Sequence, residues 1–459
     1  MQSTAHLTAI AAVSLSLAMA TATFASPAET LAFVGAPTPG SGANLVDVLN
    51  DPFVTRDGRV GFTGAIDVAG TNVHFVWFDG QIVWLNSDAL PILLTGAEGT
   101  MGVSDAGNWI YSPTESGSDS VWKDGASFAV ETQRAPGFDG QFLSFCSRPQ
   151  MDADGTPTFV AGITATQGGG TQFRALYSGT SVILAGGDIV SGETISTGSS
   201  VGFSYDFSSD GSNYIAKAII AAPTASNDVI VLNDEILARE GESTGAGDNW
   251  QTFSDVKTNS LGDYAMIGDT DAASASDGYL AFNDALVVRE GDTIGGGFTL
   301  TGNASAVGLN DVGQVGAIWN SNMGDVLFVL TPNRAGAPTL DILAKVGDPV
   351  DLDGDGTDDA TITDFNASTI IAPGLDLPRQ CRVCARVDVE DASGAEFVAI
   401  VCVPLPAAPD LANLDGVNGV NGADLAVLLG GWGAAGIADL NCDGTVDAAD
   451  LAILLGSWG

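Results

Sequence analysis

Basic residues and histidine are scarce in this sequence. It has 15 lysines and arginines against 56 aspartates and glutamates, so its formal net charge is −41, and it has 2 histidines. Nucleic acid is excluded as a natural partner, because binding to phosphates requires a positive surface. A Ser-His-Asp arrangement would have to use His74, which is expected in a strand, so no catalytic residues are predicted. The excess of carboxylates indicates either a solvated, self-repelling surface or a capacity for divalent cations.

Cysteine is also rare, with 5 residues in the whole chain. That number, in a chain of this length, excludes a small fold held together by disulfides. One pairing follows from strand register. If residues 381–389 and 397–403 form a hairpin centred on Ser393, Cys384 and Cys402 lie opposite each other and can form a bridge.

Long apolar runs are missing after the first residues. The run Leu7 to Ala22, followed by the small residues around Ala25, is typical of a secretory signal, although an ordinary N-terminal helix stays open. No later window reaches the roughly 18 apolar residues of a membrane span. We therefore predict a signal peptide at 1–25 and an exported protein, either extracellular or on the cell surface.

What the sequence does have is glycine (59 residues) and many β-forming residues. A turn containing Asp and Gly precedes an alternating strand about every 50 residues, at Gly58, Gly107, Gly155, Gly211, Gly262 and Gly313. A second series of turns lies between these, at Gly80, Gly125, Gly179, Asn233-Asp234, Asn283-Asp284 and Asn333-Arg334. Two hairpin turns per repeat mean about four strands, which is the unit of a β-propeller blade.

The ring is predicted to close through both ends of the propeller domain, residues 26–403. Six repeats are clear, and a seventh shows three strands, at 368–372, 381–389 and 397–403. Residues 31–35 resemble the last strand of a repeat with nothing before it. Adding this strand to the seventh repeat would remove two exposed sheet edges, so seven blades are preferred, with six or eight as alternatives.

The composition changes after a proline-rich linker at 404–409. Residues 410–459 contain two loop-helix repeats, whose register is fixed by Asp424 and Asp450 and by Trp432 and Trp458, each pair 26 residues apart. The apolar residues of each repeat recur with helical spacing, at Leu425, Leu428, Leu429 and Trp432, and at Leu451, Leu454, Leu455 and Trp458. Two such short helices are expected to bury these stripes against each other or against a partner.

The loop of the second repeat has the spacing of an EF-hand calcium loop. Oxygen-bearing residues occupy positions 1, 3, 5, 7, 9 and 12, with glycine at position 6: Asp439, Asn441, Asp443, Thr445, Asp447 and Asp450. An acidic run without a metal site would not reproduce the glycine at this place. We predict that calcium binds here, against the alternative of a merely solvated loop.

Two other stretches match this spacing less well. The first repeat supplies Asn413, Asp415, Asn421 and Asp424, but a valine stands at position 5, which indicates a weak or empty site. Another stretch, in the propeller domain, has Asp351, Asp353 and Asp355 at positions 1, 3 and 5 and glycine at 6, but an isoleucine at 12. It predicts either a calcium site or a polar turn.

Both parts of the chain resemble known families. The runs REGD, GGGF and LNDVGQVGA between Arg289 and Ala317 resemble uncharacterised secreted repeat proteins of planctomycetes and other environmental bacteria. This resemblance covers about residues 30–405 and implies a propeller-like fold and export, with no agreed activity. The two C-terminal repeats resemble a dockerin domain. That resemblance implies calcium ligation by residues 439–450 and binding of a cohesin-like module or another cell-surface protein through the helices.

Two functions remain in competition. The first is an exported, non-catalytic binding or scaffold protein, attached through its calcium-binding tail. The second is a polysaccharide-degrading enzyme on a propeller scaffold, since dockerins often accompany such enzymes. The first is preferred because no constellation for a specific reaction is recognised in the sequence.

Overall fold

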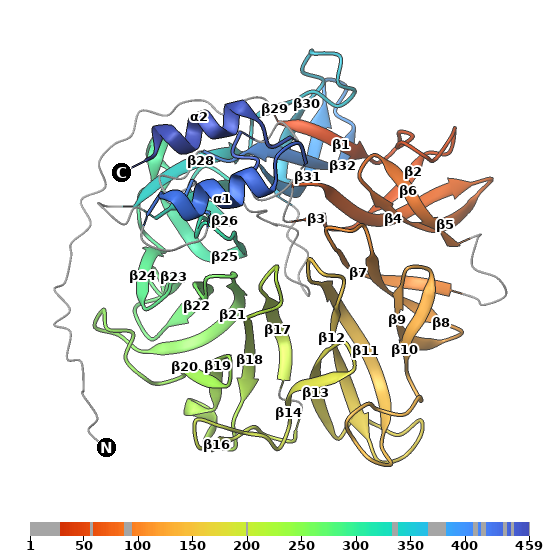
Figure 1. The fold of residues 1–459 in the computed structure, drawn as a ribbon, viewed down its shortest axis with the longest axis vertical. Coiled ribbons are helices and arrows are strands. Elements are labelled where there is room, and N and C mark those ends of the chain that lie inside the picture. Colours follow the sequence, from red (N-terminus) through yellow and green to blue (C-terminus); the bar gives the residue numbers. More distant parts are fainter. Residues whose placement is uncertain are drawn as a thin grey trace.

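The chain forms a ring of four-stranded antiparallel sheets. The computed structural model describes residues 28–55, 58–86, 94–198, 201–332, 338–365, 382–406, 412–414, 419–434, 438–441 and 445–458. The expected signal peptide at 1–25 lies outside these residues. Seven sheets follow one another around a centre, and the chain runs once around them (Figure 1). The prediction of a seven-bladed propeller is confirmed.

Six blades are built from consecutive strands that pair in chain order. Blade 1 consists of β2 (Val46–Leu49), β3 (Phe53–Val54), β4 (Val60–Val68), β5 (Thr71–Phe78) and β6 (Gln81–Leu85). Blade 2 consists of β7 (Leu94–Val103), β8 (Trp109–Glu115), β9 (Ser118–Lys123) and β10 (Ala126–Val130). Blade 3 consists of β11 (Phe142–Met151), β12 (Pro157–Thr164), β13 (Phe173–Ser178) and β14 (Ser181–Ala185). Blade 4 consists of β17 (Val201–Phe207), β18 (Tyr214–Ile219), β19 (Asp228–Leu232) and β20 (Glu235–Arg239). Blade 5 consists of β21 (Trp250–Thr258), β22 (Tyr264–Thr270), β23 (Gly278–Phe282) and β24 (Ala285–Arg289). Blade 6 consists of β25 (Leu300–Leu309), β26 (Val315–Ser321), β27 (Val326–Thr331) and β28 (Thr339–Lys345). The connections carry the hairpin β15 (Ile189–Val190) and β16 (Glu193–Thr194) and the short helices η2 (Thr224–Ser226) and η3 (Gly295–Gly297).

Within the described residues, the two predicted series of turns lie where they were expected, between strands one and two and between strands three and four. The expected turn at Asn333-Arg334 lies outside the described residues. In blade 5, Gly262 has φ +80°, which favours glycine. Asn283 in the second turn accepts a hydrogen bond from the Tyr264 backbone N–H (2.9 Å), and Asp284 accepts one from the Tyr264 hydroxyl (2.8 Å). The same contacts recur in blade 4, so the repeat preserves side-chain chemistry as well as length.

Blade 7 is assembled from both ends of the propeller domain. Its strands are β30 (Ala360–Phe365), β31 (Arg382–Asp391), β32 (Glu396–Pro404) and the N-terminal β1 (Glu29–Phe33), with the short β29 (Pro349–Val350) beside β30. Figure 1 shows the red β1 next to the blue β32. Closure by the N-terminal strand is therefore confirmed.

Two details of blade 7 complete this comparison with the sequence. Cys384 and Cys402 face each other on β31 and β32 and form a disulfide, as the register predicted. The first strand of the blade, however, is β30 at 360–365, which precedes the strand expected at 368–372. Residues 368–372 themselves lie outside the described residues. The strand was missed because its polar residues Thr361, Thr363 and Asp364 resemble a continuation of the acidic stretch before it.

Apolar side chains fill the spaces between blades. Between blades 6 and 7, Leu327 and Val329 pack in one cluster with Ile362, Val387 and Val401, all nearly inaccessible to solvent. Burial of this kind contributes about 1.5–3 kcal/mol for each large aliphatic side chain. The ring is thus held by sheet-to-sheet packing.

Hydrogen bonds also join the first turns of neighbouring blades. The backbone N–H of Asp105 donates to the carbonyl of Ala153 (3.1 Å), and that of Ala153 donates to Ser209 (2.6 Å). Asp311 accepts from the backbone of Ser260 (2.9 Å) and from the hydroxyl of Ser209 (2.7 Å). Since Ser209 and Asp311 belong to blades 4 and 6, the turns of three blades meet at this end of the ring.

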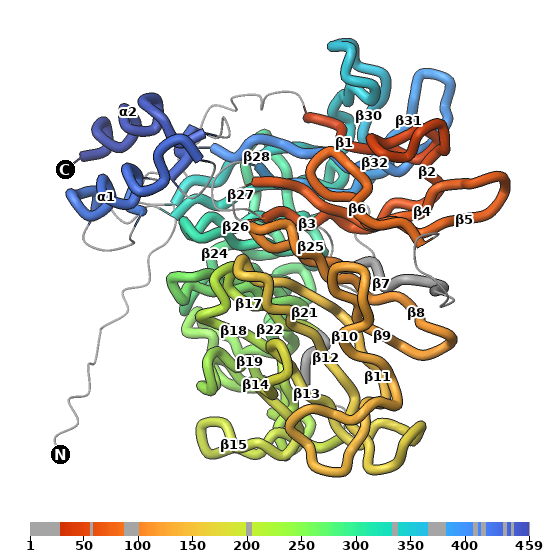
Figure 2. Tube along the Cα trace, turned by 45° about the vertical axis from the view of Figure 1, so that its right-hand side comes forward, coloured from red at the N-terminus to blue at the C-terminus, as the bar shows by residue number. Residues whose placement is uncertain are grey.

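The C-terminal repeats form two helices, α1 (Gly422–Gly430) and α2 (Ala448–Gly456). They lie together at one side of the ring, in front of β25 to β28 (Figures 1 and 2). Val312, in the first turn of blade 6, packs against the apolar cluster of the helices, and Gln314 donates to the carbonyl of Pro406 (2.8 Å). The tail is therefore docked on blade 6, and the strand β32 extends into the first residue of the expected linker, Pro404.

Neither helix in the described part of the chain is long and apolar enough to cross a membrane.

Candidate metal-binding loops and the exposed helix surface

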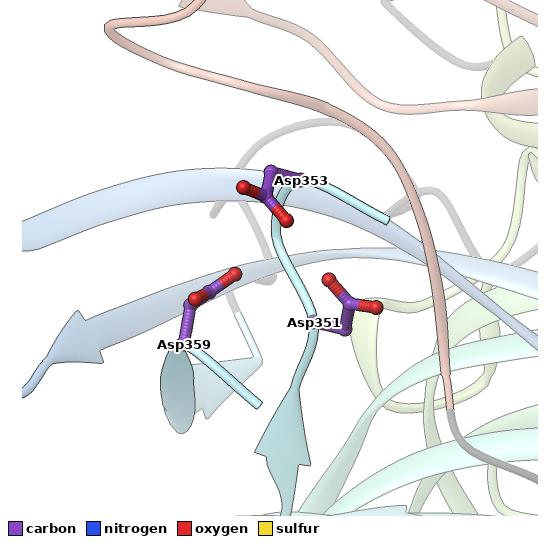
Figure 3. A group of neighbouring side chains, drawn as sticks. All are labelled: Asp351, Asp353 and Asp359. Carbon is purple, nitrogen blue, oxygen red and sulfur yellow. The ribbon is translucent and has the colours of Figure 1, made fainter. Parts of the chain in front are cut away.

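The acidic loop between β29 and β30 brings three carboxylates together. One oxygen from each of Asp351, Asp353 and Asp359 lies within 4.8 Å of the others, and the three side chains point toward a common centre (Figure 3). Two of the three are exposed and Asp351 is half-buried. Calcium prefers oxygen donors of this kind, so the geometry fits a cation of that class.

Backbone N–H groups hold this loop in shape. Asp351 accepts hydrogen bonds from Gly354 (2.7 Å) and Gly356 (2.8 Å), while Asp359 accepts one from Leu352 (3.1 Å). Both glycines have positive φ, +76° and +88°, which lets the chain turn tightly around the Asp351 carboxylate. A polar turn without metal would use these bonds too.

The membership of this group differs from the expectation in one residue. Asp355 does not belong to it, and its carboxylate accepts a hydrogen bond from the Thr357 N–H (2.8 Å). Asp359 takes its place. The signal for Asp359 was present in the sequence, since it stands at position 9 of a loop that begins at Asp351, and position 9 is a ligand position of the EF-hand.

The loop of the second C-terminal repeat has its acidic side chains turned inward at both ends. Asp439 is buried, and Asp450 is fully buried, with 0% of its surface exposed. The Asp450 carboxylate accepts hydrogen bonds from the N–H groups of Leu440 (2.6 Å), Asn441 (3.1 Å) and Asp447 (2.6 Å). A carboxylate has about four lone-pair sites, so these three bonds leave capacity for a metal. Asn441 and Thr445 are exposed, and Asp443 lies outside the described residues.

The first C-terminal loop repeats this arrangement in part. Asp424 is fully buried and accepts a hydrogen bond from the Asn421 N–H (2.7 Å). Asn413 is buried, and its side-chain oxygen has no hydrogen-bond partner among the described residues. Asp415 lies outside the described residues. An orphaned oxygen at position 1 is compatible with a cation ligand, although Asn421 already uses its side chain on Ala423 (2.9 Å) and Gly419 (2.7 Å).

Four of the expected ligands also have a structural role at the helix ends. Asn421 and Asp424 form a capping box at α1, and Asp447 and Asp450 form the same box at α2. Such caps satisfy N–H groups that the first turn of a helix leaves free. Positions 9 and 12 of both loops therefore contribute to helix stability whether or not a metal is bound.

The apolar stripe of each helix is divided between core and solvent. Leu428 and Leu454 are fully buried against each other's repeat, as the periodicity predicted. Leu425 and Leu451 are partly buried against the same cluster. The other four large apolar side chains of the stripes are about half exposed: Leu429 (52%), Trp432 (47%), Leu455 (53%) and Trp458 (46%). Burial of the stripes against each other therefore holds for one side of each helix, and burial of the other side against a partner stays a prediction.

Comparison with known proteins gives little beyond the fold. No family model matches the chain, and no curated protein matches it. Among solved structures, a protein of unknown function from Dyadobacter fermentans has 10% sequence identity and a TM-score of 0.32, covering 83% of this chain and 100% of its own. A subtype N11 neuraminidase-like protein of influenza virus A/flat-faced bat/Peru/033/2010 (H18N11) has 11% identity and a TM-score of 0.30, covering 79% and 97%.

An ancestral GH74 enzyme is also similar in part, with 13% identity and a TM-score of 0.23. It covers 78% of this chain and 41% of its own. Similarities this low do not bear on activity, so a function has to be argued from the chain's own residues.

Proposed function

We propose that the chain is an exported scaffold or binding protein, of the secreted planctomycete type, whose dockerin-like C-terminal module binds calcium and attaches the propeller to a partner. The observation that carries this proposal is the duplicated apolar surface on the helices. Leu429 and Trp432 of the first repeat and Leu455 and Trp458 of the second are all about half exposed.

Exposure of these four side chains needs a reason. Leaving apolar surface in water costs about 25 cal/mol per Å², and tryptophan is enriched among the residues that dominate binding energy at protein interfaces. The repeat also places the two pairs at equal positions on α1 and α2. A cohesin-like module or another cell-surface protein with an apolar face would cover them, and this partner is part of the proposal.

Calcium enters the proposal as the organiser of the loop before α2. Asp439 and Asp450 are both buried, and Asp450 already holds the backbone at both ends of the loop. A calcium ion would neutralise these buried charges, which are costly unless paired. The acidic group Asp351, Asp353 and Asp359 is proposed as a second, more exposed calcium site.

The calcium proposal is tested on the full chain by calorimetric titration with Ca²⁺ after chelator treatment. Asp450→Asn should abolish the tighter binding step, because it removes the ligand at position 12. Asp424→Asn is the matched control. It damages the same kind of helix cap in the loop of the first repeat, which has valine at position 5, and it should leave the tighter calcium-binding step unchanged. Asp353→Ala should remove a weaker step. No heat in the parent protein, or an equal loss in both cap variants, would contradict the proposal.

The attachment surface is tested separately. A variant with Trp432→Ser and Trp458→Ser should bind a purified cohesin-like module at least tenfold more weakly than the parent chain, since each buried aromatic contributes about 2 kcal/mol or more at a hot spot. Leu261→Ser, an exposed apolar residue on blade 5, is the matched control and should bind normally. If the parent, the double tryptophan variant and Leu261→Ser bind the cohesin-like module equally well, the assignment of this surface is wrong.

The competing proposal is a polysaccharide-degrading enzyme. Glycoside hydrolases use two carboxyl groups about 5–10 Å apart, with the sugar between them. In the described residues, the carboxyl groups of Asp325 and Asp364 approach closely, but they are hydrogen-bonded directly to each other. That contact leaves no space for a substrate between these two carboxyl groups. Release of reducing ends from any of a panel of polysaccharides by the purified chain would reverse the preference.

A further inference from the structure

The first turns of blades 5 and 6 share a backbone pattern but have different neighbours. They span residues 259–263 (NSLGD) and 310–314 (NDVGQ), and in each the first N–H donates to the last carbonyl (3.1 Å in both). Leu261 and Val312 therefore occupy equal positions in the two turns. Leu261 is 47% exposed, whereas Val312 packs against the apolar cluster of the C-terminal helices. Of these two turns, the one in blade 6 carries the tail.

The last residue of each turn shows the same contrast. In blade 5, Asp263 accepts a hydrogen bond from the Asn283 amide (3.0 Å) and so binds the second turn of its own blade. In blade 6, Gln314 is one methylene longer, and its amide donates to the Thr331 hydroxyl (3.1 Å) and to the Pro406 carbonyl (2.8 Å). Gln314 is 1% exposed. Because a buried amide requires hydrogen-bond partners, Gln314 and the linker carbonyl form a specific contact.

The apolar cluster that Val312 meets is built from the loops that are proposed to bind calcium. Its buried members include positions 2 and 8 of both loops, namely Leu414, Val420, Leu440 and Val446. Each of these residues is next to an expected calcium ligand in the chain. In the second loop, the Leu440 N–H also donates to the Asp450 carboxylate (2.6 Å). The apolar cluster and the expected ligands therefore share one backbone, so the order of one depends on the order of the other.

We propose that blade 6 is a receptor for the tail, and that docking there strengthens calcium binding by the tail, because Val312 packs on apolar residues that lie between the expected calcium ligands. This inference rests on the proposed calcium site. The effect is reciprocal, since coupling between two binding events acts equally in both directions. Calcium then holds the tail on the ring, and the exposed surface of the helices is presented to its partner in one orientation.

Docking leaves the surface proposed for the partner accessible. Trp432 and Trp458 are 47% and 46% exposed with the tail in its docked position. The contacts with blade 6 are made by other parts of the tail, which are the apolar cluster and the linker. The tail can therefore be held on the ring and bind a partner at the same time.

General attraction of cations is a competing reason for any effect of calcium on the tail. A chain with net charge −41 attracts Ca²⁺ at many places on its surface. That attraction is screened by salt and depends on charged groups. Neutral substitutions at Val312 and Gln314 leave the net charge unchanged, so they separate docking from general attraction.

The test is calorimetric titration of the full chain with Ca²⁺ in 0.15 M NaCl after chelator treatment. Val312→Ser should weaken the tighter calcium-binding step at least fivefold, since coupling between sites commonly changes affinity by about 5–150-fold. Gln314→Asn should weaken the same step, because its shorter side chain cannot span the contacts with Thr331 and Pro406. Leu261→Ser, at the equal position in blade 5, is the matched control and should bind calcium as the parent does. If Val312→Ser does not fold, Gln314→Asn decides.

Limited proteolysis near residue 406 gives a second readout. Calcium should slow cleavage several-fold in the parent and in Leu261→Ser, but not in Val312→Ser. Parent-like calcium affinity in both Val312→Ser and Gln314→Asn would overturn the coupling and leave the proposed calcium site standing. An equal loss of affinity in Leu261→Ser would indicate general destabilisation and also overturn it. A parent chain that binds no calcium would remove the coupling together with the proposed site.

Discussion

Blade 5 and blade 7 have the same number of main strands but are stabilised by contacts of different range. In blade 5, the turn residues Asn283 and Asp284 bind Tyr264, about one hairpin away in the chain. In blade 7, Glu29 of β1 is paired with Arg382 of β31 (2.9 Å), from opposite ends of the propeller domain. A local repeat can build a blade on its own, whereas closure of the ring depends on long-range pairing and on added restraints, such as the disulfide.

Among the changes that test this difference between blades 5 and 7, loss of the closing strand β1 should have the largest effect on stability. Deletion of residues 31–35 leaves the edge of β32 unpaired and should destabilise the propeller by about 3–5 kcal/mol, since each lost hydrogen bond contributes about 1 kcal/mol and apolar surface is exposed as well. Urea unfolding measures the change. Replacement of the same residues by Gly-Ser of equal length separates strand loss from shortening. An unchanged unfolding midpoint would show that blade 7 does not need β1.

Loss of the disulfide should have the next largest effect. The double substitution Cys384→Ala and Cys402→Ala should lower the unfolding free energy by about 2–4 kcal/mol, because the bridge restricts the unfolded chain. Thermal unfolding with and without reductant measures it, and reductant should affect the parent alone. Cys146→Ala, at a buried cysteine of blade 3 that lies outside this disulfide, is the control for loss of a thiol. Should the double variant match the parent, closure would rest on strand pairing alone.

Docking of the tail on blade 6 gives a further contrast between local and long-range contacts. Val312→Asp places a charge in the apolar cluster of the C-terminal helices and should detach them at a cost of about 1–3 kcal/mol. Limited proteolysis near residue 406 should then become several-fold faster. Val83→Asp, at an exposed position on blade 1, is the control. Unchanged cleavage would mean that Gln314 and the linker hold the tail without Val312.

The smallest effect is expected for a local turn contact within blade 5. Asn283→Gly keeps a residue suited to the positive φ of +51° but removes the acceptor for the Tyr264 N–H, so the cost should be about 1 kcal/mol. Urea unfolding again gives the value. A loss as large as that from deleting β1 would show that local and long-range contacts matter equally.

The sequence by itself determined the repeating unit, the turns, the pairing of residues 31–35 with the last blade and the Cys384–Cys402 register, and it favoured seven blades over six or eight. These features depend on alternation and turn chemistry, which are visible over a few residues. The two helices were also evident, because their spacing repeats after 26 residues, whereas the capping role of their first residues became evident only in the structure.

Tertiary structure decided the rest. It placed Asp359 instead of Asp355 beside Asp351 and Asp353, left half of each helical stripe exposed, docked the tail on Val312, and set Asp51 of blade 1 beside Arg386 of blade 7. Each of these outcomes depends on which distant segments meet when the ring closes. A periodic pattern gives the face on which a side chain lies, but the partner that covers that face is fixed only by the packing of the whole chain.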